Sequence, residues 1–167
     1  EFNSKNYVYV IKESKKIISK NNQIPLIYNL LGASYSLIDK HIEAIESYHN
    51  ASNLDSNNEE IYRNLGKSYS KLNQDTEAYN AFQYALSIKS NNPDAILGLG
   101  LLKLKKNKFN ESIDELNKVI KLNKNFYQAY YNIALAQNFL GNYLEAINNY
   151  LAAKKINNKY FQAYNNL

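Results

Sequence analysis

The side chains that most often bind metal ions or transfer protons are few in this sequence and badly spaced for either task. His41 and His49 are eight residues apart, which on a helix is about two turns or ~12 Å, too far to share one metal ion without further ligands. Asp114 and Glu115 are adjacent, so they point to different sides of a helix. We therefore predict that both histidines lie at the surface, that the carboxylates are structural, and that the chain binds no metal ion.

The sequence also lacks the residue patterns that usually supply a nucleophile or bind phosphate. The chain has no cysteine, so it contains no thiol nucleophile, no disulfide and no Cys-ligated metal site. Its five glycines are spread along the chain and form no phosphate-binding loop, and no nucleophile elbow is present. These observations predict no catalytic residues, no cofactor and no enzymatic activity in this sequence.

The basic residues give the chain a net charge of +5 and a pI of about 9.1, but they are not of the kind that nucleic-acid recognition favours. Of the 20 basic residues only Arg63 is an arginine, the residue that suits bidentate contacts with bases and phosphates. The chain is rich in lysine, asparagine, isoleucine and tyrosine, and AT-rich codons specify all four. Codon bias is therefore as good an explanation for the many lysines as binding of an acidic ligand. No apolar run approaches the ~18 residues of a membrane-spanning helix. We expect no membrane insertion and a cytoplasmic location, with any targeting signal upstream of Glu1 outside this sequence.

A period of 34 residues organises the chain. Gly32, Gly66 and Gly100 are 34 residues apart, and Ala134 stands at the next step. A fixed period of this length is typical of helical repeats. With the small residue placed at position 8, the sequence divides without a gap into four units, residues 25–58, 59–92, 93–126 and 127–160.

Each unit carries the pattern of two packed helices. Large residues at positions 4 and 7 are three apart and share one face of the first helix, and the small residue at position 8 lets a second helix approach closely. The second helix has mostly small residues at positions 20 and 27 with a large one at position 24, so large side chains can fill the gaps beside small ones. Proline at Pro25 and Pro93 suits the first turn of a helix, and Asn92 suits its N-cap. Turns between the two helices are predicted at Asp39, Asn73, Asn107 and Gly141.

These columns resemble the tetratricopeptide repeat (TPR), with an aromatic at position 4, Leu-Gly at 7 and 8, Tyr at 11, Ala at 20, an aromatic at 24 and Ala at 27. The segments IYNLLGASY and IYRNLGKSY, followed by EAIESYHNA and EAYNAFQYA, carry the resemblance. It implies an all-α fold, an α-solenoid of antiparallel helix pairs that forms a right-handed superhelix. Position 11 departs from the family, since Tyr35 and Tyr69 are followed by Lys103 and Gln137, and the family's proline at position 32 is absent. We therefore expect the third and fourth repeats to pack less tightly.

The two ends of the sequence resemble incomplete repeats. Residues 3–24 match the second helix of an earlier repeat, and residues 161–167 match the start of the first helix of a fifth. Repeats of this kind bury their apolar faces only against their neighbours. We expect the sequence to be a piece from within a longer array, and to associate end to end through Tyr164, Leu167 and the 7–18 helix.

The resemblance also implies where a partner binds. In the family, positions 2, 5, 6, 9, 12 and 13 of the first helix line a concave surface. We therefore predict a non-enzymatic scaffold that holds a peptide or protein segment there, with tyrosines at positions 4, 11 and 24 in the core and the lysines at 103, 105, 106 and 108 as solvated helix-end charges. The predicted partner-binding residues are Asn29, Arg63, Asn64, Lys67, Leu97, Leu101, Tyr131, Asn132, Leu135, Asn138 and Phe139.

Specialised uses of the family fit less well or only in part. Some TPR domains bind the C-terminal carboxylate of chaperones with a clamp of lysine, asparagine and arginine side chains. The full set of these residues is missing here whether the clamp is aligned from the first repeat or from the second, and Asp94 stands where the first alignment needs a cation. We therefore expect no chaperone C-terminus as a partner. An asparagine ladder like that of O-linked N-acetylglucosamine transferases is matched by Asn64, Asn132 and Asn166 but interrupted at Leu30 and Gly98. A substrate-recognition arm of a larger enzyme such as a glycosyltransferase therefore remains an alternative.

RNA binding is the second alternative, because lysine and tyrosine are abundant. Repeat proteins that read RNA place side chains at equivalent positions of each repeat. Here Glu60 and Asp94 put acidic groups on the face in question, which argues against nucleic acid.

Overall fold

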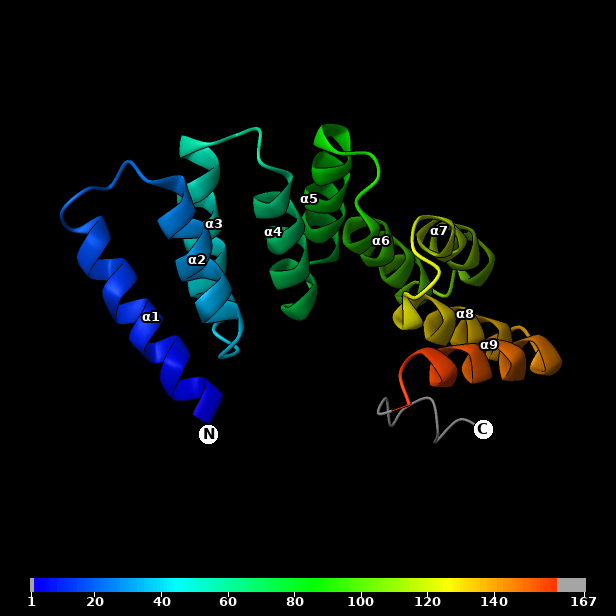
Figure 1. Cartoon of the computed structure of the whole chain (residues 1–167). Helices are drawn as coiled ribbons and strands as arrows, with labels where there is room; N and C mark the ends of the chain where they lie inside the picture. Colours follow the sequence, from blue (N-terminus) through cyan, green and yellow to red (C-terminus); the bar gives the residue numbers. More distant parts are fainter. Residues whose placement is uncertain (1, 159–167) are drawn as a thin grey trace. The chain divides into compact units, whose positions relative to one another are not determined.

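All the regular structure is helical in residues 2–158, the part of the chain that the computed structural model describes, with side chains from Asn6 onward (Figure 1). The predicted start of a fifth repeat at residues 161–167 lies outside this range, as do Tyr164, Asn166 and Leu167. No described helix is both long enough and apolar enough to cross a membrane. The helices are α1 (Phe2–Ile18), α2 (Pro25–Ser36), α3 (His41–Leu54), α4 (Glu59–Lys71), α5 (Asp75–Ile88), α6 (Pro93–Lys105), α7 (Phe109–Leu122), α8 (Tyr127–Phe139) and α9 (Tyr143–Ile156).

The helices form two compact units, which divide between Ser90 and Asn91. In the first unit, α1 packs on α2, α2 on α3, α3 on α4 and α4 on α5. In the second unit, α6 packs on α7, α7 on α8 and α8 on α9 (Figure 1). The predicted all-α fold of successive helix pairs is confirmed.

The turns inside the helix pairs share one backbone geometry. Each contains a residue with a positive φ, of 58° to 60° at Asp39, Asn73 and Asn107 and 79° at Gly141. Asp, Asn and Gly adopt this left-handed conformation at the lowest cost, which is why these types stand there. The next residue then donates its N–H to the carbonyl five residues back and closes the helix end, as in a Schellman motif. These bonds are 2.9–3.0 Å long, from Lys40 to Tyr35, Gln74 to Tyr69, Lys108 to Lys103 and Asn142 to Gln137.

Helix starts follow equally local rules. Asn92 accepts a hydrogen bond from the N–H of Ala95 at 3.1 Å, so the predicted N-cap is confirmed. Asn58 accepts one from Glu60 at 3.2 Å and caps α4 in the same way. Pro25 and Pro93 are the first residues of their helices, where proline has no intrahelical N–H to lose.

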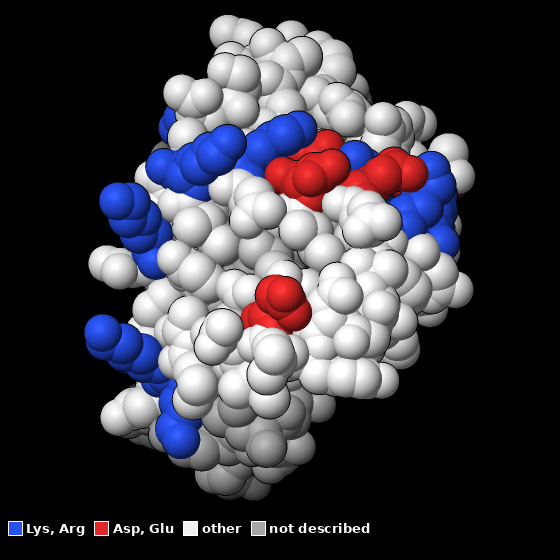
Figure 2. Space-filling model, turned by 90° about the vertical axis from the view of Figure 1, so that its right-hand side faces the viewer, with Lys and Arg blue, Asp and Glu red and all other residues white. Residues whose placement is uncertain are grey.

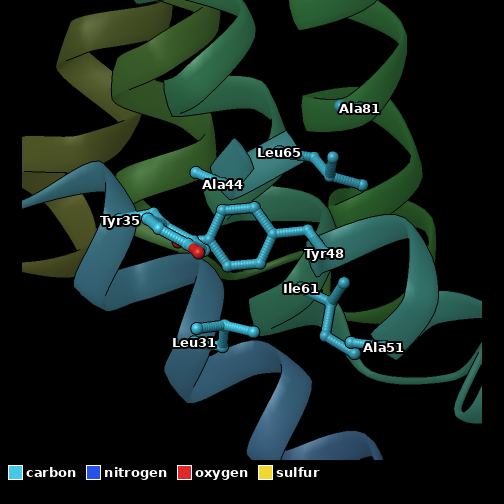
Figure 3. Close-up of a cluster of buried hydrophobic side chains, with 8 residues drawn as sticks. All are labelled: Leu31, Tyr35, Ala44, Tyr48, Ala51, Ile61, Leu65 and Ala81. Atoms are coloured by element: carbon cyan, nitrogen blue, oxygen red, sulfur yellow. The ribbon is translucent and has the colours of Figure 1, made fainter. Parts of the chain in front are cut away.

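The core of the first unit surrounds the ring of Tyr48, which is only 2% exposed. Figure 3 shows this ring among Leu31, Tyr35, Ala44 and Ile61, so side chains from α2, α3 and α4 meet at one point. Burial raises the pKa of the Tyr48 hydroxyl above its ordinary value, and the charge of Arg63 offsets part of that effect.

Position 8 must be small because the large residue at position 24 lies directly against it. A Cβ built on Gly32 or Gly66 would lie 2.6 Å from a ring atom of Tyr48 or Phe82, and one on Gly100 would lie 2.9 Å from Leu116. Such distances are well inside van der Waals contact, so the absence of a side chain sets how closely the two helices approach.

Position 11 is filled in two different ways. Tyr35 is buried and Tyr69 half-buried, and the residue twelve positions further on is small in both repeats, Ser47 and Ala81. In the third repeat Lys103 Nζ instead donates to Glu115 Oε1 at 2.8 Å, and in the fourth Gln137 Oε1 accepts from Asn149 Nδ2 at 2.9 Å. In the third and fourth repeats a polar pair therefore joins the two helices, where the first two repeats use a tyrosine. The looser packing expected for the third and fourth repeats stays a prediction.

Helix α1 meets α2 through the same positions that join α3 to α4. Lys15 Nζ lies 5.7 Å from the ring centroid of Tyr35. Thirty-four residues later, His49 Nε2 lies 2.8 Å from the hydroxyl of Tyr69. The contact is chemically different in the two places, but it joins the same two positions of the 34-residue pattern.

Replacing Gly66 tests the contact between positions 8 and 24. Gly66→Ala should lower the free energy of unfolding by ~1–3 kcal/mol, because the added methyl collides with the Phe82 ring, and Gly66→Leu should cost more. In a Phe82→Ala background the cost of Gly66→Ala should shrink, since the colliding ring atoms are gone. Urea melts of both backgrounds measure the free energy of unfolding, with exposed Thr76→Ala as a control within ~0.5 kcal/mol of wild type. An equal cost of Gly66→Ala in both backgrounds would contradict the proposed contact.

Stability at acidic pH tests the Lys103–Glu115 pair. Burial alone would raise the pKa of Glu115, but hydrogen bonds from Lys103 and Lys118, together with their charges, lower it below its ordinary value. A depressed pKa stabilises the fold above the unfolded-state pKa, and this stabilisation disappears as the pH falls through the folded-state pKa.

Glu115→Gln should therefore reduce stability by about 1 kcal/mol at pH 7, and its denaturation curve should converge with that of wild type in strong acid. Its exposed neighbour provides the control, since Asp114→Asn should change little at either pH. A constant difference between wild type and Glu115→Gln at all pH values would show that the glutamate charge contributes nothing.

Candidate binding surface on the first helix of each repeat

Two of the predicted binding residues in the first unit bond to each other. Asn64 on α4 donates its Nδ2–H to Asn29 Oδ1 on α2 at 3.3 Å, which links the first helices of two successive repeats. Asn29 is 8% exposed and Asn64 is half-buried. Within the described part of the chain, Asn29 Nδ2 and Asn64 Oδ1 make no hydrogen bond. The pair therefore retains one donor group and one acceptor atom side by side.

The cationic candidates of this unit are of two kinds. Arg63 Nη2 lies 3.3 Å from Glu60 Oε1 one helical turn away, and its side chain is largely covered. Its charge also offsets part of the rise that burial causes in the pKa of Tyr48. Lys67, one turn further along α4, is exposed. Arg63 is thus held in place by its own helix and is largely covered, whereas Lys67 is exposed.

The second unit carries the apolar candidates. On α6, Leu97 is half-buried and Leu101, one turn later, is 38% exposed. On α8, Leu135 is half-buried and Asn138 is exposed. Asn132 donates its Nδ2–H to the Gln128 carbonyl at 2.7 Å, so one of its amide hydrogens is used within α8.

The two aromatic candidates of α8 have different neighbours. The Tyr131 ring lies 5.5 Å from that of Tyr150 on α9, where it packs on a small buried cluster. Phe139 is 62% exposed, and its ring stacks on Phe109 of α7 with centroids 5.1 Å apart and planes within 10°. The structure therefore does not bring Tyr131 and Phe139 together, and Tyr131 contributes to packing within its own repeat.

Lysines near the end of α6 take part in a network of ion pairs. Lys103 Nζ lies 2.8 Å from Glu115 and 3.8 Å from Glu111, and Lys108 lies 2.9 Å from Glu111. The prediction that Lys103 is a solvated helix-end charge is wrong, because its side chain is only 25% exposed and spans to α7. On the face drawn in Figure 2, acidic side chains likewise lie beside basic ones in the upper part, and further basic side chains stand along the left edge, separated by uncharged surface. The lysines on this face therefore do not form a continuous positive patch.

The histidines are held separately. His41 was expected at the surface, which is wrong, since its side chain is 10% exposed and its Nε2 lies 3.7 Å from Asp39 Oδ1. His49 is exposed and contacts Tyr69 instead. Among the described residues no group of three or more histidine and carboxylate side chains could hold a metal ion.

Sequence reasoning missed the contacts that pair one helix with another. It named Asn29 and Asn64 separately, without the bond between them, and it did not name Phe109 at all. A signal for the polar pairs was present, because Lys103 is matched with Glu115 and Gln137 with Asn149 at the same two positions.

Solved structures with the same fold are numerous. A crystal structure of MamA is 27% identical, with a TM-score of 0.78, and the match covers 89% of this chain and 87% of that one. YrrB, described as a TPR protein with an unusual peptide-binding site, is 18% identical with a TM-score of 0.74 and coverage of 96% and 83%. The APC/C hetero-tetramer Cut9–Hcn1 matches at 17% identity and a TM-score of 0.87, over 96% of this chain and 32% of that one. At these last two identities the likeness shows the fold alone.

The family comparison rests on sequence. A search of curated proteins found no match. A model described as TPR repeat matches residues 40–73, and one described as tetratricopeptide repeat matches residues 59–92, 93–126 and 127–160. These matches extend over more than half of the sequence, and the last three coincide with the helix pairs α4–α5, α6–α7 and α8–α9. The chain belongs to the tetratricopeptide repeat family.

Proposed function

We propose that the chain is a non-enzymatic scaffold that binds a peptide or protein segment along the first helices of its repeats. The TPR fold is a protein-interaction fold, and the observation that carries the proposal is the Asn29–Asn64 pair. A peptide group offers one N–H donor and one C=O acceptor. Asn64 Oδ1 and Asn29 Nδ2 offer the complementary acceptor and donor, held in place by the bond between the two amides.

The second unit, taken by itself, offers apolar contacts on the first helices of its repeats. Leu101 is exposed, and Leu97 and Leu135 are half-buried on the first helices of the third and fourth repeats. Partly exposed leucines give a partner segment bound to this unit apolar area to cover. The peptide-binding site named for YrrB, a protein of the same fold, is consistent with this use of the repeats.

The rival functions receive less support. An asparagine ladder like that of a glycosyltransferase arm needs an asparagine at position 6 of each repeat, and Leu30 and Gly98 interrupt it here. Asn132, one of the matching residues in the described part of the chain, already donates an amide hydrogen to the Gln128 carbonyl of its own helix. The ion pairs of Lys103 and Lys108 reduce the positive charge that RNA would need. A recognition arm of a larger enzyme would use the same surface, and the full reading frame distinguishes it from a free-standing scaffold.

Peptide selection tests the proposed surface. Peptides selected from a random phage-displayed library on the immobilised chain should bind at least ~10-fold more weakly to Asn64→Ala or Asn29→Ala, as expected for loss of one well-placed contact. Calorimetry measures the affinity, and a circular-dichroism melt of each variant checks that it is folded. The control is Thr76→Ala, an exposed change on α5, which should bind as wild type. Equal affinity of every selected peptide for all three variants would place binding elsewhere.

We also propose that the chain associates end to end. Tyr9 and Ile17 of α1 are 66% and 39% exposed, and Ile147 and Leu151 of α9 are 42% and 47% exposed. In each pair the two residues lie on the same side of their helix, and apolar faces of this kind are normally covered by an adjacent repeat. Light scattering should show a mass that rises with concentration, and Ile17→Lys with Leu151→Lys should abolish the rise. A mass that stays monomeric at high concentration in the wild type would contradict this association.

A further inference from the structure

In the second repeat a tyrosine ring lies beside the aromatic residue at position 4. The rings of Tyr62 on α4 and Tyr84 on α5 have centroids 4.2 Å apart, with planes inclined by 47°. Burial raises the pKa of Tyr62, and the charge of Tyr84 and its hydrogen bond raise it further. Tyr84, at position 26, therefore covers the position-4 ring.

The fourth repeat keeps the position-4 tyrosine but lacks its cover. Tyr130 stands 68 residues after Tyr62, and the residue that matches Tyr84 is Ala152. In place of a second ring there is an open pocket of about 580 Å³ between the start of α8 and the end of α9. Its described lining is Lys124, Asn125, Tyr130, Ala152, Lys155 and Ile156.

The lining combines apolar and aromatic side chains with positive charge. Tyr130, Ala152 and Ile156 supply the apolar part, and Lys124 and Lys155 supply two positive charges. None of the six described lining residues is acidic. Two like charges around one pocket repel each other, so an anionic group placed between them is favoured.

We infer that this pocket binds an aromatic side chain of a partner protein that carries an acidic group next to the ring. The partner's ring takes the place beside Tyr130 that Tyr84 takes beside Tyr62, and the acidic group pairs with Lys124 and Lys155. This site uses positions 4, 26, 29, 30, 32 and 33 of the 34-residue pattern. It is therefore distinct from the first-helix surface proposed above and does not depend on it.

Two small probes test the pocket, 4-hydroxyphenylacetate as the anionic aromatic and 4-methylphenol as its neutral counterpart. In 1H–15N spectra of the full chain, both should give saturable shifts at Tyr130, Ala152 and Ile156, with the anion about fivefold tighter. Ala152→Tyr should abolish binding of both probes, because the new ring fills the pocket, and its melting temperature should not fall. Lys124→Gln with Lys155→Gln should remove only the preference for the anion.

The second repeat provides a matched control for the charge. Tyr84→Ala should open the equivalent space beside Tyr62, where Ser56 and Ser87 stand at the positions of the two lysines. That variant should gain 4-methylphenol binding at Tyr62 without any preference for the anion.

Three outcomes would overturn the proposal. The first is the absence of saturable shifts in the wild type, and the second is binding that persists in Ala152→Tyr. The third is binding that occurs only after Tyr160→Ala with Phe161→Ala, which would mean that the chain's own aromatic residues, and not a partner, occupy the pocket.

Discussion

The contact between the small residue at position 8 and the large residue at position 24 determines how the two helices of each repeat lie together. At Gly32 and Gly66 even a methyl group would collide with the Tyr48 or Phe82 ring. Because no side chain stands between the ring and the first helix, the two helices approach closely and the ring is almost fully buried. That close approach then brings positions 11 and 23 within reach of each other, so the remaining contacts of the repeat depend on it.

The features that the sequence predicted are those that one residue or one helix decides alone. The left-handed turns at Asp39, Asn73, Asn107 and Gly141 need residue types that tolerate a positive φ, and the helix faces follow from spacing. Contacts between helices were harder to predict, since they depend on where two helices meet. From the sequence, Lys103 was predicted to be a helix-end charge, whereas in the structure it pairs with Glu115 of α7.

The candidate site was predictable in the same limited way. Family positions indicated Asn29 and Asn64, but only the packing of α2 against α4 brings their amides together. Tyr131 and Phe139 share a helix and were expected to act together, whereas α9 and α7 engage them separately. The pocket beside Tyr130 follows from a comparison between repeats, because Ala152 stands where the second repeat has Tyr84. Positions that close packing does not fix are thus the ones at which the repeats differ and binding surfaces arise.

A crystal structure of the chain with a selected peptide would test most directly whether the paired amides recognise a peptide backbone. The account predicts a peptide N–H donating to Asn64 Oδ1 and a peptide carbonyl accepting from Asn29 Nδ2, each at about 2.9 Å, with the bond between the two amides preserved. A peptide bound to the second helices of the repeats, with both asparagines untouched, would contradict it.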